Sequence, residues 1–199
     1  MRTLILFAHP ALEKSRVNRR LAEVARGVPG ATFHDLYEAY PDFDVDVARE
    51  QELLVAHDLL VVQHPFFWYS TPALVKQWED LVLEHGWAYG TGGTALRGKA
   101  WLSALTTGGR ETAYQPDGLN RFTIRELLRP LEQTACLCGM TFLPPFVIFG
   151  THQLDGQGLE AAAADYRRTL EALRDDRIDL EAAGRWPLLN ADLDAITRK

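Results

Sequence analysis

Three short apolar runs, each followed at once by a polar or aromatic loop, constrain the fold of this chain most strongly. They are residues 3–8, 59–63 and 99–105. Runs of this length bounded by turn residues are typical of strands buried on both faces of a parallel sheet. The third run ends in two hydroxyls and two glycines, Thr106-Thr107-Gly108-Gly109. Because ligands of open α/β sheets bind at the carboxyl ends of strands, the three ends predict one shared ligand site.

Amphipathic segments separate these runs, and two further strand-like segments complete the pattern. The predicted helices are residues 15–26, 47–57, 73–83, 120–139 and 158–174, and the further strands are residues 31–36 and a segment within 140–149. This alternation predicts an α/β protein with a doubly wound, five-stranded parallel sheet and helices on both faces. Right-handed crossovers restrict the topology, and five strands fit the flavodoxin-like order 2-1-3-4-5.

The composition indicates a globular protein that does not bind nucleic acid. The chain has 199 residues, of which 47% are hydrophobic and 24% charged, and a formal net charge of −6. These values are ordinary for one globular domain, and no Lys/Arg cluster stands out. Residues 1–10 lack the charged start and long apolar stretch of a signal peptide, and no apolar run approaches a membrane span. We therefore expect a cytoplasmic protein.

We expect residues 1–174 to form the domain and residues 175–199 to form an extension packed on it or on a second subunit. The extension has no clear periodicity, but its apolar run at 186–189 needs a partner surface. Cys136 and Cys138 are two residues apart and therefore do not share a helix face. Because no further Cys or His is spaced as a metal set, we interpret them as reduced core residues and predict no metal site.

The loop after the first predicted strand can bind an anion. Residues 9–18 lead into a predicted helix N-terminus, where His9, Ser15 and Asn18 can each donate a hydrogen bond to a phosphate. Ser15 can equally serve only as the helix N-cap, and the sequence favours neither interpretation. The chain lacks a Walker A loop, a G-x-G-x-x-G turn and a G-x-S-x-G elbow, which disfavours a standard dinucleotide site and nucleophilic hydrolysis.

Two loops are rich in aromatic residues. One reads His64-Pro65-Phe66-Phe67-Trp68-Tyr69-Ser70-Thr71-Pro72, and the other carries Trp87 and Tyr89. Exposed aromatic rings are costly unless covered, so the first loop forms a wall beside a planar ligand, a dimer contact or a core plug. Tyr114 and Asn120 follow the two glycines and can hydrogen-bond a ligand oxygen. Three further histidines are interpreted as ordinary solvent-side or loop residues: His34, His57 and His152.

In combination, these segments resemble the NAD(P)H:quinone oxidoreductases of the DT-diaphorase type. The resemblance rests on residues 8–10, 64–69 and 106–109. Within that group the chain is most similar to the ancillary proteins of glutathione-gated potassium efflux, KefF and KefG. The segments that carry this closer similarity are residues 40–43, 63–65, 68–70, 85–90, 92–96 and 143–146. The resemblance covers residues 1–174.

The resemblance implies a flavodoxin-like homodimer with a flavin at each subunit junction. Three loops then supply the cofactor-binding residues: His9, Ser15, Val17 and Asn18 for the phosphate and ribityl end, Pro65, Phe66, Phe67, Trp68 and Tyr69 for the isoalloxazine edge, and Thr106, Thr107, Gly108 and Gly109 for the pyrimidine side. Tyr114 matches a tyrosine near the flavin. The longer diaphorases have a histidine shortly after that tyrosine, whereas the nearest counterpart here is Asn120, so a tyrosine–histidine proton relay lacks its histidine.

The resulting hypothesis is a flavin-dependent NAD(P)H:quinone oxidoreductase with a ping-pong mechanism. Hydride passes from NADH or NADPH to flavin N5 and then to a quinone, and the protein supplies orientation and electrostatics. The N–H groups of Gly108 and Gly109 stabilise negative charge on the reduced flavin, and Tyr114 and Asn120 complete the catalytic set. Trp68, Trp87 and Tyr89 from two subunits bind the substrate. The chain lacks the length of FAD-binding diaphorases, so FMN is favoured and FAD is the alternative.

Two other functions stay open at this point. One is a regulatory ancillary subunit that activates a membrane potassium-efflux transporter; this role is compatible with the enzyme activity and would bring the protein to the inner face of the cell membrane. The other is a flavodoxin-like electron carrier. The aromatic-rich loops argue against a carrier, because a carrier needs an exposed flavin edge rather than an aromatic slot.

Overall fold

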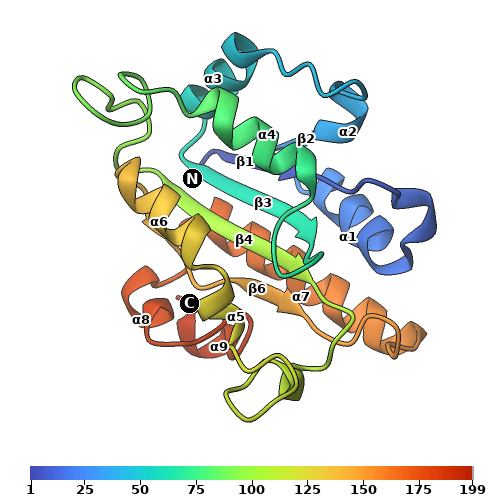
Figure 1. Ribbon diagram of the computed structural model, residues 1–199. Helices are drawn as coiled ribbons and strands as arrows, with labels where there is room; N and C mark the ends of the chain where they lie inside the picture. Colours follow the sequence, from blue (N-terminus) through green and yellow to red (C-terminus); the bar gives the residue numbers. More distant parts are fainter. Residues whose placement is uncertain (199) are drawn as a thin grey trace.

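The computed structural model describes residues 1–198 and shows one parallel sheet between two layers of helices (Figure 1). The strands are β1 (Thr3–Phe7), β2 (Ala31–Asp35), β3 (Leu59–Pro65), β4 (Ala100–Thr106), β5 (Thr141–Phe142) and β6 (Phe146–Ile148). Their order is β2-β1-β3-β4-β5, and β6 also pairs with β4. Every strand pair is parallel. The predicted α/β class and strand order are therefore confirmed, with a sixth strand added.

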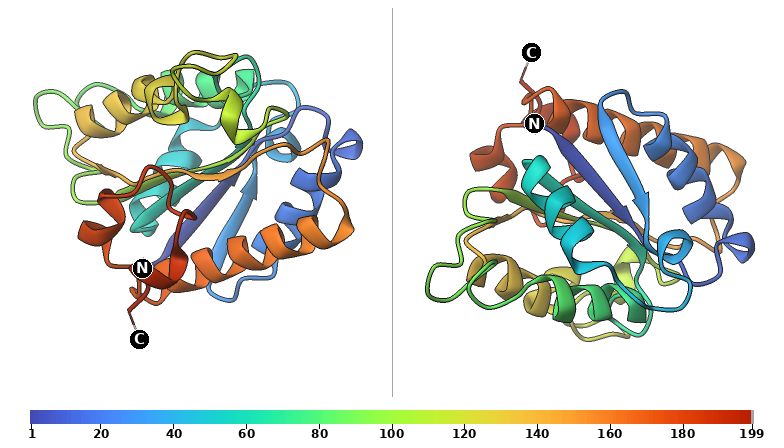
Figure 2. Two further views of the ribbon diagram at one scale, coloured as in Figure 1. Left: turned by 90° about the horizontal axis from the view of Figure 1, so that it is seen from below. Right: turned by 90° about the horizontal axis from the view of Figure 1, so that it is seen from above.

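Helices cover both faces of the sheet, as Figure 2 shows from two directions. The longer helices are α1 (Arg16–Arg26), α3 (Val47–Ala56), α4 (Ala73–Val82), α6 (Arg129–Leu137) and α7 (Gly156–Arg174). The short ones are α2 (Leu36–Ala39), α5 (Ile124–Leu127), α8 (Leu180–Gly184) and α9 (Leu193–Ile196), with 3-10 turns η1 (Leu12–Lys14) and η2 (Glu111–Ala113). Helices α1 and α7 share one hydrophobic core with the sheet, and α3, α4 and α6 share the other.

Prolines divide the fifth predicted strand. The segment expected to hold one strand forms β5 and β6, because Pro144 and Pro145 lie between them and cannot donate the hydrogen bonds of a sheet ladder. Conversely, the expectation that His64-Pro65 ends the third strand is wrong by two residues. Strand β3 continues through Pro65, which is paired with Thr106 at the end of β4.

The helical segment predicted over residues 120–139 begins at residue 124 and is divided at Leu128. Thr123 caps α5 in a capping box with Glu126, which fixes the start. The interpretation of both cysteines as core residues is half wrong: Cys138 is buried, but Cys136 is exposed. Their helical spacing explains the difference, since residues two apart do not share a face.

A buried carboxylate joins three elements on the α3–α4 side of the sheet. Glu50 of α3 has no exposed surface and accepts hydrogen bonds from His34 Nε2 at 2.7 Å, Tyr40 Oη at 2.6 Å and Trp78 Nε1 at 2.8 Å. Burial acts to raise the pKa of Glu50, but these donors outweigh it and hold the pKa below its usual value. The expectation that His34 is a solvent-side residue is therefore wrong.

Residues after α7 pack along the outer strand β6. Asn190 exchanges two hydrogen bonds of 3.0 Å with the backbone of Val147, and the Leu189 N–H donates to Pro145 O at 2.9 Å. Leu189, Leu193 and Ile196 join the core of α1 and α7. Residue 199 of the expected extension lies outside the described residues. Within residues 1–198, no helix is both long and apolar enough to cross a lipid bilayer.

Removing the carboxylate of Glu50 should destabilise the protein strongly. Glu50→Ala leaves three buried donors without an acceptor, and breaking a buried charged network typically lowers the free energy of unfolding by about 3–5 kcal/mol. Urea denaturation measures the change. Glu52→Ala, an exposed position on the same helix, is the matched control and should alter stability by less than about 0.5 kcal/mol. Equal effects of the two substitutions would contradict this assignment.

Candidate functional site

A cavity of about 660 Å³ lies at the carboxyl ends of β1, β3 and β4. Its lining residues come from three predicted loops and from the loop before α7: His9, Ala11, Lys14, Ser15, Arg16, Val17, Asn18, Pro65, Phe66, Phe67, Thr106, Gly108, Thr151, His152 and Leu154. The cavity therefore stands where the strand order of the sheet reverses, which is the usual ligand position in open α/β sheets.

The N-terminus of α1 forms one end of this cavity. Ser15 is the N-cap of the helix, and its Oγ accepts hydrogen bonds from the Asn18 N–H at 3.2 Å and from Asn18 Nδ2 at 3.1 Å. The hydroxyl hydrogen of Ser15 stays free to donate. Capping and anion binding, which were posed as alternatives, are thus compatible here. The helix N-terminus adds a partial positive charge beside that hydroxyl.

His9 lies in the same end of the cavity as a neutral ring with a free donor. Its Nδ1 accepts from the Ala11 N–H at 3.1 Å, so the proton is on Nε2. Burial lowers the pKa of His9, and Glu13 acts in the opposite direction. The ring packs edge-on against Phe67 at 5.9 Å between centroids. These contacts fix the orientation of a ring that can donate from Nε2 to an anion.

Two basic residues beside Ser15 were missed in the sequence reasoning. Lys14 and Arg16 both line the cavity, and Arg16 donates to the backbone oxygen of Leu154 across it. Their signal was present, since they flank the N-cap serine directly in the sequence. They make this end of the cavity locally basic on a chain whose net charge is −6.

The segment after β4 is held to its neighbours by its hydroxyls and carbonyls. Asn18 Nδ2 donates to Thr106 Oγ1 at 2.9 Å, and the Thr107 hydroxyl donates to Gly109 O at 2.8 Å. Within residues 1–198, no protein acceptor takes the N–H of Gly108 or Gly109. Two fixed, unpaired backbone donors at the end of a strand can stabilise an anion or a polarised ring oxygen.

Gly108 matters because it leaves space in the cavity, and not because it allows an unusual backbone conformation. A Cβ at this position would lie 3.0 Å from His152 Nε2, and Gly108 does not adopt a positive φ. A side chain at this position would therefore meet His152 without straining a left-handed backbone. His152 is an exposed loop residue, as expected, but its ring also lines the cavity beside Gly108. Nothing in its local sequence distinguished it.

The aromatic loop after β3 forms a strained turn. Trp68 and Tyr69 both have positive φ, 48° and 64°, and the Ser70 N–H donates to Phe67 O at 3.0 Å. Positive φ at a bulky residue is uncommon and is found at binding and catalytic sites more often than elsewhere. The turn leaves Trp68 92% exposed, whereas Phe66 is buried between this loop and Tyr114. The sequence predicted an aromatic wall, but it did not predict that the Trp68 side chain points into solvent.

Tyr114 lies under the Gly108–Gly109 segment. A Cβ on Gly109 would lie 3.1 Å from the Tyr114 ring, which also contacts Phe66 and Phe149. Burial raises the pKa of Tyr114, so its hydroxyl is protonated at neutral pH. Asn120 accepts a hydrogen bond from Tyr69 Oη at 3.2 Å. The structure therefore brings Tyr114 and Asn120 to the same side as the aromatic turn.

Trp87 and Tyr89 do not reach this site within one chain. The loop that carries them precedes β4 and lies at the amino end of that strand, whereas the Trp68 turn lies at the carboxyl end of β3 (Figure 1). Neither residue lines the cavity at the three strand ends. Trp68 and Trp87 could share a substrate slot only if they came from different subunits.

An open parallel sheet with an anion-ready cavity at its carboxyl edge defines a flavodoxin-like α/β protein. The chain matches the Flavodoxin_2 family, described as a flavodoxin-like fold, over residues 1–170, and it belongs to that family. Fold and family agree with the resemblance inferred from the loops.

Named relatives cover most of the chain. It is 48% identical over 163 residues to the "Uncharacterized NAD(P)H oxidoreductase YrkL" of Bacillus subtilis (strain 168), covering 82% of this chain and 94% of the relative. It is 47% identical over 163 residues to the glutathione-regulated potassium-efflux system ancillary protein KefG of Pectobacterium carotovorum subsp. carotovorum (strain PC1), covering 82% and 89%.

Two solved structures resemble this one closely. General stress protein 14 of Treponema denticola, in complex with FMN, has a TM-score of 0.83 and 41% identity, covering 87% of this chain and 99% of that one. An NADPH-quinone reductase from P. pentosaceus has a TM-score of 0.77 and 32% identity, covering 85% and 97%.

Proposed function

We propose that this protein is a flavin-dependent NAD(P)H:quinone oxidoreductase that binds one FMN per subunit. The observation that carries the proposal is the cavity where three strand ends meet, with a helix N-terminus at one end and the free N–H groups of Gly108 and Gly109 beside it. Relatives named as NAD(P)H oxidoreductases, an FMN complex and a quinone reductase of the same fold support it.

The residues of the cavity fit an FMN. Ser15, His9 Nε2 and the first turn of α1 would hold its phosphate, with Lys14 and Arg16 adding positive charge and Val17 and Asn18 completing this end. The aromatic turn from Pro65 to Tyr69 would lie along the ring system, and the Thr106–Gly109 segment at its polar edge. The bound flavin would supply two-electron hydride chemistry, which protein side chains cannot provide.

The chain's own groups would then orient the reactants and stabilise charge. The N–H groups of Gly108 and Gly109 are unpaired and fixed, so they can offset negative charge that develops beside them without reorganisation. Tyr114 can donate a hydrogen bond from a protonated hydroxyl into the same region. Asn120 can orient Tyr69 but cannot move a proton as a histidine would. NADH or NADPH and the quinone would use the same face in turn.

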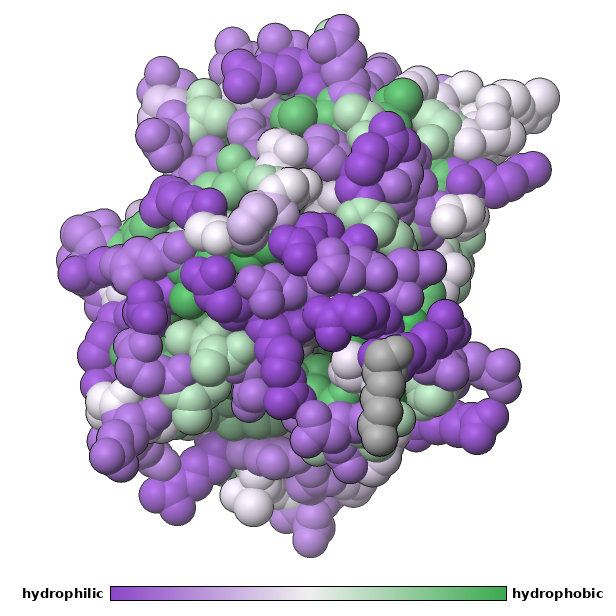
Figure 3. Space-filling model, turned by 180° about the vertical axis from the view of Figure 1, so that it is seen from behind, coloured by the Kyte–Doolittle hydropathy of each residue, from purple (hydrophilic) through white to green (hydrophobic). Residues whose placement is uncertain are grey.

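We further propose that the active form is a homodimer. Trp68 is 92% exposed, and Phe67, Tyr69, Leu119 and Phe122 around it are 46–88% exposed. The face seen from behind in Figure 3 is mainly hydrophilic, with small scattered apolar areas. Apolar groups gathered at one edge typically mark an interface. A second subunit would cover this edge and bring its own Trp87 and Tyr89 to the Trp68 turn.

A second role, as an ancillary subunit of a potassium-efflux transporter, is favoured by the similarity to KefG. It is compatible with the enzyme activity, and it would place a cytoplasmic protein at the inner face of the membrane through its partner. We also propose that residues 1–174 form the flavin-binding domain and that residues 175–199 are an extension of it. The contacts of Asn190 and Leu189 with the outer strand support that division.

FMN binding should depend on the space beside Gly108. The purified protein should show a flavin absorbance spectrum or take up one FMN per subunit, whereas Gly108→Val should lose most of this affinity because its side chain meets His152 in the cavity. Equilibrium titration of FMN fluorescence measures both. Gly156→Ala, where a Cβ meets no atom within 4 Å, is the control. A wild-type protein that binds neither FMN nor FAD would contradict the proposed function.

The Tyr114 hydroxyl should affect turnover without affecting flavin content. Because Asn120 cannot relay a proton, we expect Tyr114→Phe to lower turnover by only about tenfold, which is less than the 10²–10⁴-fold typical of a general acid or base. Stopped-flow kinetics separate reduction of the flavin by the nicotinamide from its reoxidation by the quinone. If both half-reactions run at the wild-type rate, the hydroxyl has no part in the chemistry.

Self-association should depend on the aromatic turn. Sedimentation equilibrium should give a dimer for the wild-type protein and a weaker one for Trp68→Ala, because interface aromatics typically contribute 2 kcal/mol or more when buried, roughly a thirtyfold change in the dissociation constant. Trp186→Ala removes a half-exposed tryptophan outside the aromatic edge and serves as the control. A fully active monomer at the assay concentration would contradict the dimer.

A further inference from the structure

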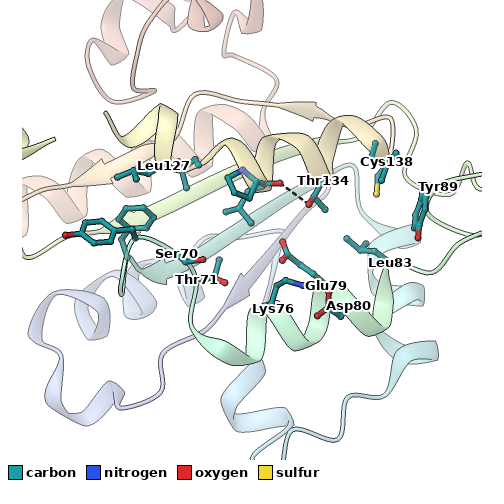
Figure 4. A pocket seen from close by; sticks show the side chains of 16 residues that line it. Ser70, Thr71, Lys76, Glu79, Asp80, Leu83, Tyr89, Leu127, Thr134 and Cys138 are labelled. Carbon is teal, nitrogen blue, oxygen red and sulfur yellow. Dashed lines mark hydrogen bonds and ion pairs between the residues drawn. The ribbon is translucent and has the colours of Figure 1, made fainter. Parts of the chain in front are cut away.

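A second cavity, of about 340 Å³, lies between α4 and α6, on the side of the sheet away from α7 (Figure 4). Its lining combines apolar side chains, among them Leu83 directly after α4 and Leu131 of α6, with polar ones such as Glu79 and Thr134. Phe66 and Tyr69 line one end and Tyr89 lines the other. The proposed flavin chemistry uses neither the middle of this cavity nor the helix faces that form it.

An unpartnered carboxyl group points into the middle of the cavity. Glu79 of α4 extends toward α6 in Figure 4, and its side chain is among the buried polar groups at 8% exposure. Its Oε1 has no hydrogen-bond partner within residues 1–198. Burying a carboxyl oxygen without a partner costs free energy, and a ligand that donates a hydrogen bond to it would offset that cost.

In the described part of the chain, the one cationic residue that lines the cavity is Lys76, which is already paired with another carboxylate. Lys76, one turn earlier on α4, pairs with Asp80 at the surface, where both side chains are more than half exposed. The other titratable residues that line the cavity carry no positive charge: Asp80, Cys138, Tyr69 and Tyr89. Among the described residues Glu79 therefore forms no ion pair of its own, and Lys76 acts on it only from a distance.

Burial makes the protonation state of Glu79 responsive near neutral pH. Desolvation raises its pKa to about 7, Lys76 opposes the rise and Asp80 adds to it. From the facing helix, the buried thiol of Cys138 has a raised pKa and is neutral. A ligand that supplies a positive charge and an N–H donor would favour the ionised carboxylate and satisfy Oε1.

We propose that the cavity between α4 and α6 is a second small-molecule site, which binds a protonated amine on an apolar body with its N–H groups donating to Glu79. The apolar part would lie against Leu83 and Leu131. The Thr134 hydroxyl already donates to Pro130 O at 3.0 Å, so it keeps acceptor capacity for a further N–H. The site is distinct from the flavin cavity, but Phe66 lines both cavities. A ligand in one cavity can therefore change the position of Phe66 in the other.

Calorimetric titration with benzylamine, and with benzyl alcohol as a neutral ligand of similar shape, tests this site without any flavin assay. Benzylamine should bind the wild-type protein, and its affinity should fall by at least about tenfold in Glu79→Gln, the loss expected for a charge-assisted hydrogen bond. Benzyl alcohol should bind both proteins weakly and alike. Asp80→Asn, which alters the neighbouring exposed carboxyl, should leave benzylamine affinity within about twofold.

The affinity of the wild-type protein should also rise with pH. Amine binding requires ionised Glu79. Burial raises the pKa of Glu79 to about 7, so below that pH the carboxyl is protonated in most molecules. Benzylamine affinity should therefore increase from about pH 6 to about pH 8, while Glu79→Gln shows no such increase. Thr134→Leu fills part of the cavity and leaves Glu79 in place, and it should also weaken the binding of benzylamine.

Three results would overturn the proposal. They are absence of benzylamine binding to the wild-type protein, equal binding by Glu79→Gln, and binding that Thr134→Leu leaves unchanged. If Glu79→Gln instead weakens self-association and no amine binds, a second copy of the chain occupies the cavity and the small-molecule site is wrong. A flavin-free but folded protein can still show benzylamine binding, so this test and that of the proposed function fail independently.

Discussion

The structure depends on one constraint: β1, β3 and β4 are buried along their whole length, so a polar side chain within them has no access to solvent and needs a partner inside the core. Every residue of these three strands is buried. Gln63 of β3 has such a partner, since the Tyr166 hydroxyl donates to its Oε1 at 2.9 Å, but no ligand can reach a side chain buried in this way. Functional groups are therefore confined to the loops that leave the carboxyl ends, and parallel pairing brings those loops to one edge.

Hydrogen bonds between the loops make that edge a single site. Asn18, from the first turn of α1, bonds Thr106 at the end of β4, and the Phe66 N–H donates to Thr106 O at 2.8 Å. The Thr107 N–H in turn donates to Ile148 O at 2.9 Å, which fixes the glycine segment against β6. Because these bonds satisfy the surrounding backbone, the N–H groups of Gly108 and Gly109 are left as the available donors. The free donors are a consequence of how the neighbouring loops are tied together.

The aromatic turn and the buried Glu79 are two places where local stability is reduced beside a cavity. Trp68 and Tyr69 hold positive φ values that bulky residues avoid, at a typical cost of about 1–3 kcal/mol each. Glu79 keeps a carboxyl oxygen without a partner in an apolar cavity. Both lie on the side of the sheet that carries α4, and both line or adjoin cavities. Departures of this kind typically coincide with binding sites, because a ligand or partner supplies what the chain alone lacks.

The sequence by itself determined the strand order, most of the helices and the loops that surround the main cavity, because apolar periodicity and turn residues are local signals. It also brought Ser15, Asn18 and the Thr106–Gly109 segment to one edge correctly. Tertiary structure alone decided that His152 faces Gly108, that His34 bonds a buried Glu50 and that Trp87 stays away from Trp68. It alone decided that Glu79 has no partner. These features join residues far apart in the chain or depend on side-chain direction, and neither is encoded in a local pattern.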